Sequence, residues 1–185
     1  MIFISWAEGT PASLFLIAPI VIGIWAFVTG QVPHSSGPLL GVWITTISIG
    51  LVILGVIEFA SENIVGGTLN MVFGPLLGLG GGMSFTMLYW MNIPVTISGY
   101  IFIVASAILL LFVPSIKKLP VKTMFYAQID VAIGALLLGL SMAGLLPMVY
   151  EKIGGWLLLI FGLYCLYAAT AMMTNEVYEK KLLPV

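Results

Sequence analysis

Long apolar runs, separated by short polar stretches, dominate the pattern of this chain. A helix that crosses a lipid bilayer needs about 20 predominantly apolar residues, and six runs approach or exceed that length. The sequence therefore predicts transmembrane helices over residues 12–30, 39–60, 64–90, 97–113, 123–149 and 153–174. Because the connections are short, residues 1–185 are expected to form a single transmembrane domain, an all-α six-helix bundle.

Prolines mark four of these runs. Pro19 interrupts the first run, and Pro75 lies within the glycine-rich third run. Pro114 is expected to end the fourth helix, because the residue before a proline disfavours the helical conformation. Pro147 is expected to lie inside the fifth helix.

The composition supports a membrane environment. Only 7% of the residues are charged and 61% are hydrophobic, whereas a soluble domain has about a quarter of its residues charged. The net charge is −1 without any arginine, so the basic surface that binds nucleic acid is missing. The partner expected from composition is therefore the lipid bilayer, with no nucleic acid.

Catalytic and metal-binding patterns are absent from the sequence. One histidine, one cysteine and scattered carboxylates cannot supply the ligand spacing of a metal site. We expect no cofactor, no metal and no enzyme activity. Cys165 is interpreted as a small packing residue, and His34 either as a surface histidine or as a pH-sensitive residue at an entrance.

The lysines predict an orientation. With six spans, Lys117, Lys118, Lys122, Lys180 and Lys181 share one side of the membrane with the N-terminus, and only Lys152 lies opposite. Cytoplasmic loops carry an excess of lysine and arginine. Both termini are therefore expected in the cytoplasm, with the chain in the cytoplasmic (cell) membrane.

Gly74, Gly78 and Gly82 recur every four residues in the third run and so share one helix face. Such a ridge of small residues lets another helix backbone approach closely. We interpret it as a packing face, inside the bundle or between protomers, in preference to a pore lining.

Two carboxylates are candidates for a proton or charge site. Asp130 lies about two turns into the fifth run, where an ionised carboxylate costs on the order of 3 kcal/mol. It is either a pore-side proton or cation site or a hydrogen-bonded structural residue, with Gln128, Tyr126 or a neighbouring helix as partner. Glu58 ends the second run, and we favour a solvated position there, with water or a lysine such as Lys122 nearby.

Two helix starts carry distinctive residues. Thr10 is predicted to cap the first helix, with Pro11 in its first turn. The third helix begins with a glycine-rich segment, residues 64–70. Helix N-termini present free N–H groups and positive dipole ends that favour carboxylates, although ordinary capping would select the same residue types.

At these two starts the sequence resembles the acetate uptake transporter family, the succinate–acetate permeases. The family signature Asn-Pro-Ala-Pro-Leu-Gly-Leu corresponds to residues 10–16, where proline, alanine and both leucines agree. The second and third resemblances lie at the start of the third run and at the chain end. They comprise Glu58, Asn63, Gly66, Gly67, Thr68, Leu69, Asn70, Phe73 and Gly74, then Gly155, Trp156, Tyr167, Asn175, Glu176, Leu183 and Pro184.

The resemblance implies six helices around a pore in each protomer, a ring-shaped homo-hexamer, and passage of acetate, related short carboxylates or succinate. It also implies an apolar constriction built from the first, third and fifth helices. Phe73 and Ile129 fall on two of its positions, and the first-helix position, an aromatic in bacterial members, falls near Ala18 or Pro19. The substrate pathway would involve Thr10, Pro11, Gly66, Gly67, Thr68 and Asn70.

The sequence thus predicts an acetate channel or a proton-coupled acetate transporter. One alternative is a urea or short-amide channel, which would not need helix N-termini directed at an anion. The other is an accessory membrane subunit without a pore, against which an intramembrane Asp130 argues.

Overall fold

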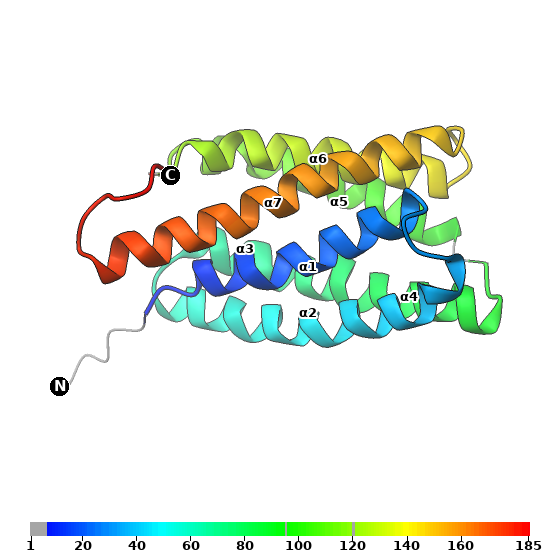
Figure 1. Ribbon diagram of the computed structural model, residues 1–185, viewed down its shortest axis with the longest axis horizontal. Coiled ribbons are helices and arrows are strands. Elements are labelled where there is room, and N and C mark those ends of the chain that lie inside the picture. Colours follow the sequence, from blue (N-terminus) through cyan, green and yellow to red (C-terminus); the bar gives the residue numbers. More distant parts are fainter. Residues whose placement is uncertain (1–6, 95, 120) are drawn as a thin grey trace.

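The computed structural model describes residues 7–94, 96–119 and 121–185, and every regular element among them is a helix. The elements form a bundle of long rods (Figure 1). Their bounds are α1 Thr10–Val28, η1 His34–Ser36, α2 Gly37–Ala60, α3 Ile64–Phe73, η2 Gly74–Leu79, α4 Gly80–Met91, α5 Thr96–Ile116, α6 Thr123–Met142 and α7 Val149–Val177.

Six rods are long and apolar enough to cross a membrane, which confirms the predicted all-α bundle. The third rod is α3, η2 and α4 taken together, running without a break over Ile64–Met91. It is therefore one span whose central turn differs from its two ends.

Several helix ends differ from the prediction. The α5 helix runs through Pro114 to Ile116, and Pro114 lies in its last turn, so only one backbone hydrogen bond is lost there. The α6 helix ends at Met142 instead of 149, because Gly144 adopts φ +73° and turns the chain away. Pro147 consequently lies in the loop, and α7 begins at Val149, before the predicted residue 153.

The glycine ridge packs inside the bundle, against α2. A Cβ atom on Gly82 would lie 2.6 Å from the Gly41 carbonyl oxygen, and one on Gly78 would overlap the Ser48 side chain. Real Cβ atoms do not approach neighbours that closely, so only glycine permits this distance between the rods. The predicted packing face is confirmed, although Gly74 and Gly78 also line a cavity on the inner side of the rod.

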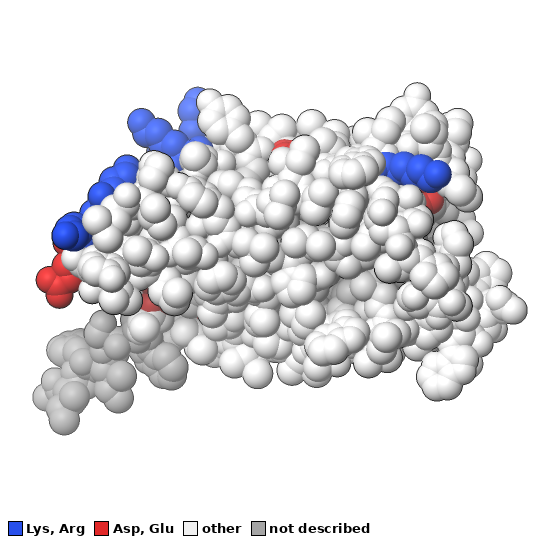
Figure 2. Space-filling view, viewed as in Figure 1, with Lys and Arg blue, Asp and Glu red and all other residues white. Residues whose placement is uncertain are grey.

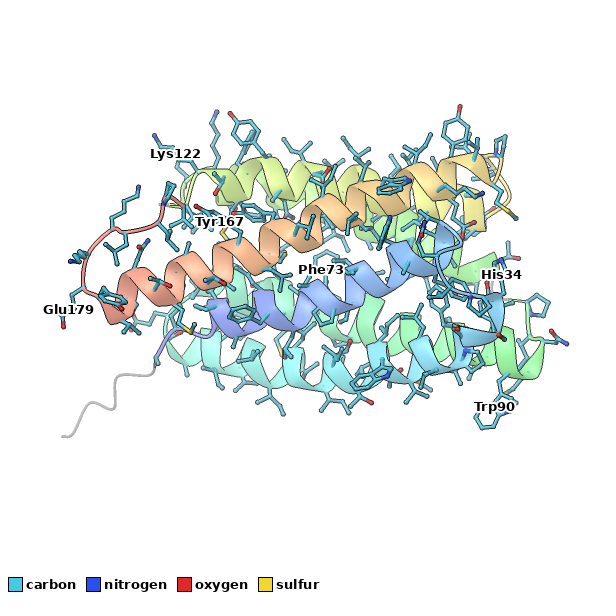
Figure 3. The ribbon with its side chains drawn as sticks, viewed as in Figure 1. His34, Phe73, Trp90, Lys122, Tyr167 and Glu179 are labelled. Atoms are coloured by element: carbon cyan, nitrogen blue, oxygen red, sulfur yellow. The ribbon has the colours of Figure 1, made fainter. Side chains whose placement is uncertain are left out.

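The two ends of the bundle differ in charge (Figure 2). The α1 helix begins and the α7 helix ends at the same end (Figure 1). We call it the lysine-rich end, because it carries the lysines of the α5–α6 loop and of the tail, Lys117, Lys118, Lys122, Lys180 and Lys181. His34 and Trp90 lie at the opposite end (Figure 3).

Candidate transport pathway

A cavity of about 380 Å³ lies inside the bundle and reaches the lysine-rich end. The α1, α3, α5, α6 and α7 helices and the η2 turn supply most of its wall. Its outer part is lined by Glu8, Thr10, Asn63, Val65, Gly66 and Val121, and its inner part by apolar side chains such as Ile17, Val21, Leu77 and Val131. The cavity is therefore polar at its mouth and apolar at depth.

Hydrogen bonds between helices fix the polar mouth. The Thr10 hydroxyl donates to Glu8 Oε1 at 2.8 Å, and Asn70 Nδ2 donates to Ser13 Oγ at 2.7 Å. Thr10 is the first residue of α1, whose N-cap is Gly9, so the prediction that Thr10 caps this helix is wrong. Its hydroxyl is directed at a neighbouring carboxylate and makes no capping bond to its own helix.

Asn63 is the centre of the mouth. Its Oδ1 accepts from the Gly66 N–H at 2.9 Å and so caps α3. Its Nδ2 lies 3.0 Å from Thr10 Oγ1 and 3.2 Å from Glu8 Oε1, and it also donates to Glu58 Oε2. One side chain thus joins the segment before α1, the end of α2 and the start of α3.

The expected solvated position of Glu58 is wrong. Its side chain is 0% exposed in the last turn of α2, behind the mouth, and its hydrogen-bond donor is Asn63 and not a lysine. A Cβ on Gly66 would lie 2.6 Å from Glu58 Oε2. Gly66 is therefore the residue that makes room for the buried carboxyl group, while Glu62 at the turn is exposed.

The η2 turn forms the wall at mid-depth. It is a π-helical turn in which the Gly80 N–H donates to the Pro75 carbonyl, five residues back. Proline cannot supply the N–H of a regular helix, and a π-helical turn is frequent at functional sites. Gly74, Leu77 and Gly78 of this turn line the cavity. The sequence showed Pro75, but it held no signal for the changed helix pitch.

A second cavity, of about 290 Å³, lies toward the opposite end. Its polar lining includes Ser84, Tyr89, Ser98 and Glu151, and Ser98 Oγ donates to Ser84 Oγ at 3.1 Å. Sequence reasoning missed these residues because they come from three helices and form no local motif. His34 packs its ring on Tyr89, at 6.1 Å between centroids, close to this cavity.

The two cavities share three lining residues, Ile24 of α1, Phe102 of α5 and Leu138 of α6. These side chains are 8%, 6% and 2% exposed and belong to one packed apolar cluster. A Cβ on Gly139 would lie 2.9 Å from the Phe102 Cβ, so the glycine lets α5 carry this ring close to α6. We call the three residues the constriction.

Of the predicted constriction residues, only Phe73 lines the cavity, where it is half-buried (Figure 3). The α6 residues that line the cavity lie along one face of the helix, and they are Met124, Ala127, Gln128, Val131, Ala135 and Leu138. Ile129 lies one residue off that face, and Pro19 is exposed on the outer face of α1. Their placement at the constriction is therefore wrong, although α1 does contribute through Ile24.

The predicted substrate-pathway residues also divide into those that line the cavity and those that do not. Thr10, Gly66 and Asn70 line the cavity, and Pro11, Gly67 and Thr68 do not. A Cβ on Gly67 would lie 2.7 Å from the Phe59 ring, so Gly67 is a packing residue. The Thr68 hydroxyl donates to the Ile64 carbonyl of its own helix at 2.7 Å.

Of the two alternatives for Asp130, the pore-side position is not found, because the residue lines neither cavity. Its Oδ2 is buried and has no hydrogen-bond partner among the described residues, and Gln128 donates instead to the Leu109 carbonyl at 3.0 Å. Cys165 is 0% exposed among small and apolar side chains, which confirms its interpretation as a packing residue.

Comparison with solved structures gives a clear likeness. No family model matches the sequence, and no curated protein does. The fold is similar to that of the bacterial acetate channel SatP, with a TM-score of 0.85 over 97% of this chain and 98% of that chain, at 16% sequence identity. At this identity the match shows the fold alone, and it agrees with the six-helix membrane fold that the sequence resemblance implied.

Proposed function

We propose that this chain is a membrane channel for acetate and related short carboxylates. The observation that carries the proposal is the arrangement of the two cavities. They approach each other from opposite ends of one bundle and share the constriction of Ile24, Phe102 and Leu138. A pathway of this shape lies within one protomer and does not need a neighbouring chain to complete it.

The chemistry of the pathway suits a small carboxylate. The α1 and α3 helices both begin at the lysine-rich end, and their N-termini favour negative charge near the mouth. The polar side chains of Thr10, Asn63 and Asn70 line the mouth there. Beyond them the wall is apolar and suits a methyl group, while a dry apolar constriction opposes passage of a hydrated ion.

Two alternatives are separated by one experiment. A urea channel would conduct urea, and an accessory subunit without a pore would conduct neither solute. Purified protein in lipid vesicles should take up labelled acetate faster than empty vesicles and should exclude urea. Uptake of urea without acetate would contradict the proposal, and so would uptake of neither.

Orientation, assembly and coupling belong to the same proposal. We place both termini in the cytoplasm because the lysine-rich end carries five of the six lysines. Labels attached after Lys181 should be reachable only from inside the cell.

We propose a ring-shaped homo-hexamer on the family resemblance, which native mass spectrometry of the purified protein tests. We also propose proton coupling, which acetate flux under a pH gradient tests. We propose that succinate passes as well, which competition between acetate and succinate tests.

A further inference from the structure

The buried Glu58 carboxyl group lacks the partners that an ionised carboxylate needs. Its side chain is 0% exposed, and Oε1 has no hydrogen-bond partner among the described residues. Oε2 accepts from the Asn63 amide. A carboxylate accepts several hydrogen bonds, and leaving the ion buried without them is far less favourable than leaving the neutral acid in the same position.

The surrounding hydrogen-bond donors cannot make up this deficit. Asn63 Nδ2 carries two hydrogens but lies near three acceptors, Glu58 Oε2, Glu8 Oε1 and Thr10 Oγ1. The single Thr10 hydroxyl hydrogen goes to Glu8. The Glu8 side chain is exposed to solvent, whereas the buried Glu58 carboxyl group has only the shared Asn63 amide as a donor among the described residues.

Among the described residues, no positively charged side chain lies on the elements around this group. The α1 and α3 helices carry no ionisable side chain, Glu8 precedes α1, and Glu62 follows α2 on the exposed side of the turn. A negative charge on Glu8, which shares the Asn63 amide, disfavours a second negative charge on the buried Glu58.

We propose that Glu58 and Glu8 form a proton-binding pair, in which Glu58 holds the proton behind the lysine-rich mouth and Asn63 links it to Glu8 in the cavity lining. This inference rests on the proposed function in one respect, that a carboxylate enters at this mouth. Loss of the proton leaves two negative charges beside the entrance and repels an anion. Proton binding and carboxylate entry therefore favour each other, since coupling between two binding events is reciprocal.

The direct test is infrared spectroscopy of the purified full-length protein, in which a protonated carboxyl group absorbs apart from carboxylates and amides. At neutral pH, Glu58→Gln should remove part of this absorption. Glu176→Gln, which alters an exposed carboxylate of α7, should leave it unchanged. Glu58→Gln keeps the side chain's size, and size-exclusion chromatography verifies that the variant is folded. An unchanged protonated-carboxyl absorption in Glu58→Gln would overturn the inference.

A second variant tests whether the two groups act as a pair. Removing the Glu8 charge eases ionisation of Glu58, so in Glu8→Gln the Glu58 absorption should disappear at lower pH than in the unaltered protein. An identical titration would show a single buried acid and would overturn the pairing. Acetate flux through the unaltered protein should decline as the pH rises, because Glu58 loses its proton. In Glu58→Gln part of this decline should be absent. If the unaltered protein carries no acetate, the proposed function fails, while the infrared result still decides the proton site.

Discussion

The two cavities are built in different ways, although both lie along one pathway. The mouth at the lysine-rich end is fixed by Asn63, which bonds to three chain segments at once. The cavity at the opposite end has a single side-chain hydrogen bond between helices among its lining residues, from Ser98 to Ser84. The first mouth is therefore pre-organised to recognise a polar group, whereas the second is better suited to admit and release solute.

The wall of the first cavity at mid-depth, where η2 packs against α2, should be the place where a substitution destabilises the protein most. We expect Gly78→Ala to destabilise the protein by about 1–3 kcal/mol, because the new methyl group overlaps the Ser48 side chain and forces α2 away from η2. Gly81→Ala is the matched control, since a Cβ there meets no atom within 4 Å. Thermal unfolding of the two purified variants measures the difference, and equal melting temperatures would show that the close approach is not required.

The contrast between the two mouths is tested by removing one polar residue from each. Asn63→Ala breaks the junction of three segments and leaves Glu58 without a donor, so it should cost about 1–3 kcal/mol. Ser98→Ala removes one hydrogen bond and should cost about 0.5–1.5 kcal/mol. Acetate flux per folded protein should fall more in Asn63→Ala. The reverse order in stability and flux would show that the opposite mouth is the organised one.

A smaller effect, on the selectivity between two solutes, should distinguish side chains that line the cavity from side chains that do not. Phe73→Ala widens the cavity at mid-depth, so it should raise the flux of a larger carboxylate such as succinate relative to acetate. Ile129→Ala alters a side chain off the lining face and should leave that ratio unchanged. Competition between the two labelled solutes in vesicles measures the ratio. An equal change in both variants would mean that the lining face of α6 has been wrongly assigned.

The span pattern was predictable because membrane helices need long apolar runs, and the six runs match the six rods. The helix ends were less predictable, since α6 ends at Met142, before Gly144, and does not include Pro147, and Pro114 does not end α5. The packing of the glycine ridge was also predictable. The four-residue spacing of Gly74, Gly78 and Gly82 places them on one helix face, however the helix is rotated in the bundle.

The pathway could be predicted only where its residues are local in sequence. Thr10, Gly66 and Asn70 stand at recognisable helix starts, and all three line the cavity. The constriction joins residues from three distant helices, and its position depends on how each helix is rotated. A rotation of one residue, about 100°, separates Gln128 from Ile129, and the apolar sequence on both faces of α6 gives no sign of it.

The most direct test of the account concerns the constriction. Leu138→Ala should raise acetate flux per folded protein in lipid vesicles, because a smaller side chain opens the contact between the two cavities. Ile133→Ala is the control, on the outer face of the same helix. A faster flux in Leu138→Ala alone is the predicted result. Flux that is unchanged or lower in folded Leu138→Ala would contradict a pathway through these two cavities.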